Sequence, residues 1–202
     1  MEFQLFLNDL PDNINIVGDI AIDTEAMGLN NYRDRLCLLQ LSDETGKIYL
    51  VQFAKGKYDA PNLKKILSDK NRQKILHFAR FDVAIIHHYL GILMENIFCT
   101  KIASKLVRTY TDSHGLKDLS RDMLGVTISK AQQSTDWGAE TLTKDQLAYA
   151  ASDVLHLHQL RDKLKVLLLR ENRMDVAQKC FDYLPYRALL DDMGFSPDLL
   201  EH

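Results

Sequence analysis

Asp23 and Glu25 stand one residue apart within the stretch "IVGDIAIDTEAMGL", which covers residues 16–29. The apolar residues predict a strand over Ile16–Ile22, and alternate side chains of an extended chain share a face, so both carboxylates point the same way while Thr24 takes the other face. Two carboxylates at the end of a buried strand raise each other's pKa unless a cation lies between them. The pair indicates a divalent-metal site, although a solvated loop end is the alternative in a chain with 28 acidic residues.

Asp82 is a third acidic residue placed beside a predicted strand. The run Lys74–Phe78 predicts that strand, and the following "ARFD" puts Asp82 in the first turn of a helix. An aspartate near a helix N-terminus is also favoured by the helix dipole and by the unpaired amides there. A purely structural role therefore stays open for this residue at this point.

Tyr149 and Asp153 are four residues apart in "YAASD", a spacing that puts both on one face of a helix, one turn apart. A periodic run over residues 143–173 predicts one long helix, with Thr143 as N-cap and Gln146 as its capping-box partner. Small and apolar neighbours in this run are expected to pack on a sheet. This packing would place the tyrosine and the aspartate at the margin of a buried interface, and a partly solvated helix face is the alternative.

The elements that must position these side chains begin with strands and continue with helices. Strands at Leu36–Leu41 and Lys47–Phe53 are joined by "SDETGK", whose Gly46 and polar neighbours predict a hairpin turn. The remaining segments are helices at residues 61–69, 81–92, 101–110 and 115–125, a short strand at 96–100, a polar connection at 129–140, and a final helix and loop at 174–202. The second of these helices is expected to end near Gly91, and the fourth is expected to stop at Gly125. This order predicts an α/β domain with a mixed sheet and helices on both faces.

Composition narrows the classes of function. The chain has 202 residues, 46% of them hydrophobic and 26% charged, which suits a globular domain with a substantial core. A net charge of −3 argues against a protein that holds long nucleic acid mainly by neutralising phosphates, but it allows a small nucleotide ligand held through metal ions. The sequence has neither a glycine-rich dinucleotide fingerprint nor a Walker phosphate loop.

Cysteines and apolar runs bear on location. The three cysteines, Cys37, Cys99 and Cys180, are far apart and favour buried thiols over a disulfide framework or a zinc site. No apolar run approaches the ~18 residues of a membrane span, and the N-terminus lacks the basic and apolar regions of a secretory leader. We therefore expect a cytoplasmic protein without membrane association.

In chain order, the motifs D-T-E, H-x4-D and Y-x3-D resemble those of the DEDDy branch of the DnaQ-like 3′–5′ exonuclease superfamily. The stretches "QLSDETGKIYLVQF" and "YAASDVLHL" are similar to the ribonuclease D group in particular. The likeness is greatest to its small single-domain members, the nano-RNase C proteins, through "DRLCLLQL" and "FCTKIASKLVRTYTDSHGLK". The resemblance covers almost the whole chain and implies a DnaQ-like (ribonuclease H-like) α/β fold with a mixed five- to six-stranded sheet flanked by helices.

This resemblance implies two divalent cations per site, Mg²⁺ or Mn²⁺, which are ions that prefer carboxylate oxygens. Asp23, Glu25 and Asp153 would hold the ion that binds the attacking water. Asp23 would hold the other ion together with Asp82, which would act partly through water. Tyr149 would orient the water rather than deprotonate it, because a phenol with a pKa near 10 is a poor base at neutral pH.

Substrate contacts are also implied by the resemblance. The spacing D-x-E-x-x-G-L matches Asp23, Glu25, Gly28 and Leu29, and in related oligoribonucleases the leucine wedges between two terminal bases; an ordinary buried leucine is the alternative. The other expected contacts are Thr24, Met27, His77 and Phe81, although a core position is the commoner fate of such a phenylalanine. Trp137 is expected to pack in the core, and structural roles are expected for His87, His88, His156 and His158.

The resemblance implies hydrolysis of short oligoribonucleotides, notably dinucleotides, by a homo-oligomer whose subunits form an octameric ring. Residues 1–202 would form a single exonuclease domain with 171–202 as a helical tail, because too few residues follow to form the C-terminal domain of full-length ribonuclease D. A general 3′–5′ exonuclease that trims longer RNA or DNA ends is the alternative. An inactive nucleic-acid-binding adaptor would be expected to lack a ligand, whereas all four acids and the tyrosine are present.

Overall fold

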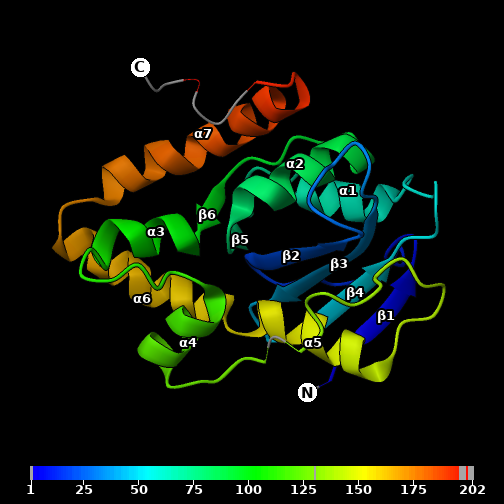
Figure 1. Cartoon of the computed structure of the whole chain (residues 1–202), viewed down its shortest axis with the longest axis horizontal. Helices are drawn as coiled ribbons and strands as arrows, with labels where there is room; N and C mark the ends of the chain where they lie inside the picture. Colours follow the sequence, from blue (N-terminus) through cyan, green and yellow to red (C-terminus); the bar gives the residue numbers. More distant parts are fainter. Residues whose placement is uncertain (1, 130, 196–198, 200–202) are drawn as a thin grey trace.

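The structure, a computed structural model, describes residues 2–129, 131–195 and 199 (Figure 1). The remaining positions of the expected C-terminal tail, 196–198 and 200–202, lie outside the described residues. The elements follow in the order β1 (Gln4–Leu7), β2 (Ile20–Ala26), β3 (Leu36–Asp43), β4 (Ile48–Gln52), α1 (Pro61–Leu67), β5 (Lys74–Leu76), α2 (Ala79–Leu90), β6 (Ile97–Cys99), α3 (Thr100–Val107), α4 (Leu116–Leu124), α5 (Lys144–Leu155), α6 (Leu157–Arg170) and α7 (Met174–Asp192).

Six strands form one mixed sheet in the order β1-β4-β3-β2-β5-β6. Strand β3 runs antiparallel to both of its neighbours, and the other pairs are parallel. The expected mixed sheet and the hairpin between β3 and β4 are confirmed. Strand β1 was not expected from the sequence, because its four residues gain their ladder partners only from β4.

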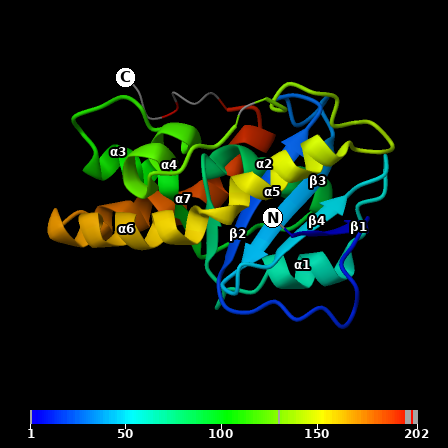
Figure 2. The same cartoon turned by 90° about the horizontal axis from the view of Figure 1, so that it is seen from below.

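Helices cover both faces of this sheet. Helix α5 packs on β2, β3 and β4, while α2 packs on β3 from the opposite side and carries α7 on its outer surface (Figure 1). Figure 2 shows α5 and α6 following one another at an angle along the molecule. All eight residues of β3 are buried, as expected for a strand covered on both faces. Among the described residues, no helix combines the length and apolar character that a bilayer span requires.

The strand expected at Ile16–Ile22 begins four residues later, at Ile20. Arg72 explains the shift, because its guanidinium donates to the carbonyl oxygens of Ile16 and Gly18 and so occupies groups that a strand would use for its ladder. Gly18 adopts φ +66°, a left-handed conformation that breaks an extended segment. The strand also extends to Ala26, so Asp23 and Glu25 lie inside β2 rather than beyond its end.

The single long helix expected over residues 143–173 is wrong, because the structure has two helices that meet at His156. His156 has φ −108° and ψ 0°, which lies outside the helical region. Past this point Arg161 binds Asp19, and α6 packs mainly on α3 and α4, with smaller contacts to β5 and β2. The change of direction comes from these tertiary contacts, which the helical periodicity does not encode. The capping box of Thr143 and Gln146 is confirmed.

Smaller expectations divide in the same way. Helices α2 and α4 end at the glycines expected to stop them, Gly91 and Gly125, both in the left-handed conformation. Cys37 and Cys99 are buried thiols as expected, whereas Cys180 is only half-buried.

Candidate active site

Strand β2 presents the first two carboxylates. Asp23 lies opposite Gln40 in the β2–β3 pair, and the Gln40 side-chain amide donates to Asp23 Oδ2 at 2.7 Å. Gln40 is fully buried, so this amide fixes the carboxylate without competing water. The pairing register shifts directly after Glu25, and the irregularity turns the chain away from the sheet towards the loop that follows.

Helix α5 supplies the third carboxylate. Its face towards β2 carries Asp153, and one oxygen each from Asp23, Glu25 and Asp153 lie within 4.8 Å of one another. Strand alternation predicted only that Asp23 and Glu25 share a face, and their meeting with Asp153 was implied by the family resemblance. Asp153 is only 9% exposed.

Asp82 is positioned by the start of α2 and lies slightly apart from this group. Its Oδ1 accepts a hydrogen bond of 2.7 Å from Thr24 Oγ1, which points to the other side of β2 from Asp23 and Glu25. Asp82 is 3% exposed and adds electrostatically to the same cluster, since its charge also raises the pKa of Glu25. A ligand role acting partly through water stays a prediction for Asp82.

The four carboxyl groups are electrostatically unfavourable without a cation. Burial raises the pKa of Asp23, and burial together with the Asp23 charge raises the pKa values of Glu25, Asp82 and Asp153. Among the described residues, no basic side chain offsets these raised pKa values. Carboxylate oxygens held this close, in a buried position and without a compensating cation, fit a divalent metal ion of the Mg²⁺ or Mn²⁺ type.

Tyr149 lies beside Asp153, one turn earlier on α5. Burial and the charges of Asp153 and Glu25 raise the pKa of its hydroxyl above the ordinary range for tyrosine, so the hydroxyl keeps its proton at neutral pH. The ring of Tyr149 stacks obliquely on Trp137, with 6.1 Å between the centroids. Trp137 is buried at 2% exposure, as expected, but it also borders the site and thereby orients Tyr149.

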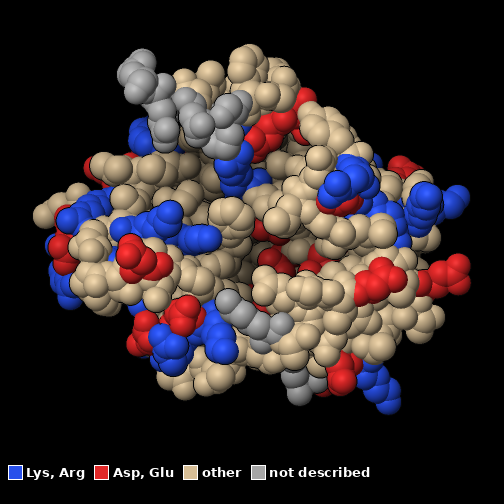
Figure 3. Space-filling model, viewed as in Figure 1, with Lys and Arg blue, Asp and Glu red and all other residues tan. Residues whose placement is uncertain are grey.

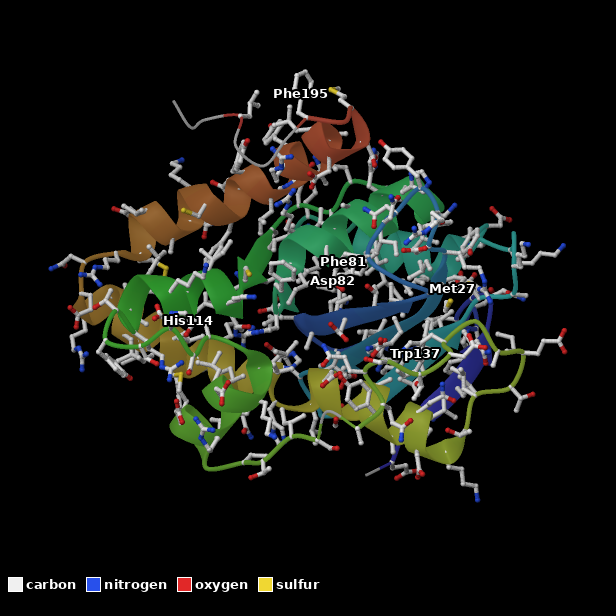
Figure 4. The ribbon with its side chains drawn as sticks, viewed as in Figure 1. Met27, Phe81, Asp82, His114, Trp137 and Phe195 are labelled. Carbon is white, nitrogen blue, oxygen red and sulfur yellow. The ribbon has the colours of Figure 1, made fainter. Side chains whose placement is uncertain are left out.

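A cavity of about 740 Å³ opens over these groups. Figure 3 shows the hollow at the centre of this face, with acidic atoms at its floor and basic side chains on the flank formed by α3 and α4. In Figure 4, Phe81 and Asp82 lie at the start of α2, across from Trp137. Of the residues that the sequence proposed for catalysis and substrate contact, only Asp82 does not line this cavity. The residues that do line it are Asp23, Thr24, Glu25, Met27, Gly28, Leu29, His77, Phe81, Tyr149 and Asp153.

Leu29 is 85% exposed at the rim of the cavity, so an ordinary buried position is wrong for this leucine. Gly28 explains how the chain reaches this position. A Cβ atom at residue 28 would collide with the Asp34 carboxylate, which accepts a hydrogen bond of 3.0 Å from the Asn30 amide and closes the turn. Glycine is therefore required for the turn that exposes Leu29.

His77 and Phe81 line the opposite part of the cavity. His77 Nδ1 lies 2.9 Å from Thr100 Oγ1, and burial lowers the pKa of the imidazole to about 3, so the ring is neutral. Neither residue takes part in the carboxylate cluster. Their contacts with a substrate stay a prediction.

Gln40, Lys101 and Lys117 are among the lining or supporting residues that sequence reasoning missed. Gln40 carries no local signal, because it is the pairing register that brings it to Asp23. Lys101 and Lys117 lie on α3 and α4, and each looks like an ordinary surface lysine in the sequence. Lys101 places its ammonium group 4.1 Å from the centroid of the Phe78 ring. These lysines are the cations that border the cavity among the described residues.

Comparison with known proteins identifies the class. Residues 4–169 match the family model described as "3'-5' exonuclease", and the chain belongs to this family, in its ribonuclease D-like DEDDy branch. Ribonuclease D of Gluconacetobacter diazotrophicus is 35% identical over 179 residues, which cover 89% of this chain and 44% of the relative. The chain thus spans less than half the length of this curated relative.

Solved structures agree with the sequence resemblance. Brucella melitensis NrnC is 49% identical, with a TM-score of 0.95 and complete coverage of both chains. Structures of that protein with bound Mg²⁺ and bound to pGG are similar to the same extent, at TM-scores of 0.94 and 0.95. Escherichia coli RNase D is 30% identical, with a TM-score of 0.76 over 85% of this chain and 45% of that chain. The DnaQ-like fold and the nano-RNase C resemblance are confirmed.

Proposed function

We propose that this protein is a metal-dependent 3′–5′ exoribonuclease that hydrolyses short oligoribonucleotides, with dinucleotides as preferred substrates, to nucleoside monophosphates. The observation that carries the proposal is the group formed by Asp23, Glu25 and Asp153 at the floor of the cavity that Leu29 borders. Buried carboxylates with raised pKa values and no neighbouring cation destabilise a fold. They suit a site that holds divalent ions.

The donor set supports two ions, with Asp23 shared between them. Asp23, Glu25 and Asp153 would hold the first, and Asp23 with Asp82 the second. Bound divalent cations would lower the pKa of an attacking water and neutralise charge on the phosphate and the leaving oxygen. Gln40 holds one oxygen of Asp23 by its 2.7 Å hydrogen bond, which fixes the orientation of the shared carboxylate.

Tyr149 supplies positioning by hydrogen bonding. Because its hydroxyl stays protonated, it donates to the attacking water or to a phosphate oxygen and accepts no proton in the reaction. Its oblique contact with Trp137 restricts the ring to one orientation. We therefore assign no side-chain base to the attacking water, whose pKa a bound divalent cation would lower.

Preference for short RNA is supported by four features. Leu29 stands exposed at the rim, where it can separate two bases, and the cavity volume lies within the usual range for small-molecule sites. The net charge of −3 does not favour long polyanions. The similar Brucella melitensis NrnC structure is bound to pGG. Assembly into an octameric ring stays a prediction implied by the resemblance, and a cytoplasmic location stays a prediction from the sequence.

A length series tests the proposal. We would incubate the purified protein with 5′-labelled RNAs of two to seven residues and with matched DNA, in Mg²⁺, Mn²⁺ or EDTA, at two salt concentrations. We expect the highest single-turnover rate for the dinucleotide, weak dependence on salt, and no cleavage in EDTA. A binder that tracks phosphates would instead lose affinity with a slope of roughly 0.7 per phosphate on a log scale.

Two controls separate the outcomes. The Glu25→Gln variant removes a charge at the floor of the cavity, whereas Glu95→Gln removes one that forms an exposed ion pair with Lys70. Cleavage lost in the first and kept in the second assigns the activity to this site. A rate that rises steadily with substrate length would replace the dinucleotide preference by a general 3′–5′ exonuclease activity on longer RNA or DNA ends.

A further inference from the structure

Residues 27–35 connect β2 to β3, and we term this segment the wedge loop because it carries Leu29. Its own turn is closed by hydrogen bonds of 3.0 Å from the Asn30 amide to Asp34 Oδ2 and from the Tyr32 amide to Asn30 Oδ1. These bonds shape the loop, but they do not fix its position relative to the rest of the cavity wall. That position requires a contact outside the loop.

Tyr32 makes such a contact with the end of α7. Its hydroxyl donates to the Asp192 carbonyl oxygen and lies 3.4 Å from that of Asp191. The last carbonyls of a helix have no partner within the helix, so they are available to accept a hydrogen bond from the tyrosine. The Tyr32 ring also packs edge-on against His88 of α2, with 5.2 Å between the centroids.

The same turn of α7 holds the start of α2. Arg80 forms a bidentate pair with Asp191, at 2.7 and 3.0 Å, and Asp191 also accepts from Arg187. Arg80 is followed directly by Phe81 and Asp82, which belong to the cavity wall and to the acidic cluster. The end of α7 is thereby bonded both to the wedge loop, which carries Leu29, and to the start of α2, which carries Phe81.

A second cavity, of about 390 Å³, lies between these walls and adjoins the first through shared lining residues. Leu29, Phe78 and Phe81 line both cavities. Tyr32, Arg80, Asp191 and Asp192 line the second one only. The contacts at the end of α7 therefore set the distance between the wedge loop and the start of α2, and with it the space beside Leu29.

We propose that Tyr32 is a positioning residue, which docks the wedge loop on the end of α7 and so sets the place of Leu29 between the two bases of the substrate. The inference rests on the proposed function, since it concerns how that site recognises a dinucleotide. Tyr32 itself touches neither the carboxylates nor the first cavity. It acts through Leu29, and its loss affects only substrates that reach Leu29.

The test compares two substrates in the Tyr32→Phe variant, which keeps the ring and removes the hydroxyl. For a dinucleotide we expect KM to rise about three- to tenfold with little change in kcat, as for the loss of one hydrogen bond that acts equally on bound substrate and transition state. For the p-nitrophenyl ester of a nucleoside 5′-monophosphate, which has one base, we expect both constants unchanged. Binding of a dinucleotide labelled with 2-aminopurine, measured by fluorescence in Ca²⁺, should weaken by the same factor.

A double-variant cycle and a matched control complete the design. Adding Tyr32→Phe to Leu29→Ala should change KM for the dinucleotide less than about twofold, because the group being positioned is already gone. Tyr186→Phe alters a tyrosine of α7 that is 62% exposed and should match the wild type. Equal losses on both substrates, additive effects with Leu29→Ala, or no change at all would each overturn the inference. Absence of hydrolysis and of binding in the wild type would instead reject the proposed function.

Discussion

Thr24 Oγ1 donates a hydrogen bond of 2.7 Å to Asp82 Oδ1 and thereby joins the middle of β2 to the first turn of α2. Both residues are buried, at 7% and 3% exposure. Asp23 and Glu25 flank Thr24 in the chain, so this bond fixes the fourth carboxylate relative to the other three. The residue between the two acids is thus part of the site rather than a spacer.

Replacing Thr24 by valine should weaken metal-dependent activity. The change keeps the shape but removes the side-chain donor to the Asp82 carboxylate, and a hydrogen bond to a charged group contributes about 1.5–3 kcal/mol. We expect the Mg²⁺ concentration for half-maximal activity to rise about tenfold or more, as measured by a metal titration. Thr24→Ser keeps the hydroxyl and should stay near the wild type. Equal behaviour of the two variants would contradict this role.

The variants Asp23→Ala and Asp153→Ala should abolish hydrolysis while the metal-free fold stays intact or gains stability. Each removes a buried carboxylate whose neighbours repel it, so the cluster loses part of its electrostatic cost. Thermal melts in EDTA and a cleavage assay measure the two effects. Asp145→Ala, an exposed position on the same helix, serves as control. Residual activity above about 1% would argue against a two-metal site.

Stability without metal should fall as pH rises from about 4 to 8. Burial raises the pKa of Asp23 to about 7 and that of Asp153 to about 8, so in this interval the folded protein retains protons that the unfolded chain has released. Where the folded state binds more protons, stability decreases with increasing pH. Melting curves in EDTA across this range should show the decrease, and saturating Mg²⁺ should remove it.

The effect of His77 on stability has the opposite pH dependence to that of the carboxylates. A comparison of variants is therefore needed to separate the two effects. Its pKa is lowered to about 3, so its contribution to stability is present above pH 6.5 and is lost as the pH falls. The difference in stability between Asp23→Asn and the wild type isolates the carboxylate. This difference should favour the variant increasingly above pH 4. A constant difference would mean that Asp23 titrates normally.

Tyr149→Phe should lower kcat by about tenfold or more and leave KM for a dinucleotide nearly unchanged. The hydroxyl is assigned a hydrogen bond to the attacking water or to a phosphate oxygen, which matters chiefly in the transition state. The ring remains available for its contact with Trp137. Steady-state kinetics on the dinucleotide measures the split. Unchanged turnover with collapsed affinity would show that Tyr149 serves binding instead.

Local patterns predicted the parts of the site that lie within single elements. Alternation along β2 paired Asp23 with Glu25, and the four-residue spacing on α5 paired Tyr149 with Asp153. The meeting of these two pairs followed from the family resemblance, since neither period relates a strand to a distant helix. Gln40 was missed for the same reason, because only the pairing of β3 with β2 brings it to Asp23.

Errors in the predicted elements arose where side chains from elsewhere replace local backbone bonds. Arg72 takes carbonyls that a strand at Ile16 would use, and the break at His156 accompanies a change of main packing partner from the strands β2, β3 and β4 to helix α3. The exposed position of Leu29 was similarly undetermined, because its burial depends on how the wedge loop docks. Helix ends marked by glycine or by a capping box were predicted correctly, since their signals are local.

Helix α7 is part of the folded unit, although it lies beyond the end of the family match. The match ends at residue 169, before α7 begins. Nevertheless the centroid of the Phe181 ring in α7 lies 4.8 Å from that of Phe98 in β6, and α7 packs against α2. A protein truncated after Arg170 would expose this apolar surface to solvent and would tend to aggregate. For gene shortening or fusion, the unit that can be transplanted as a whole therefore extends through α7.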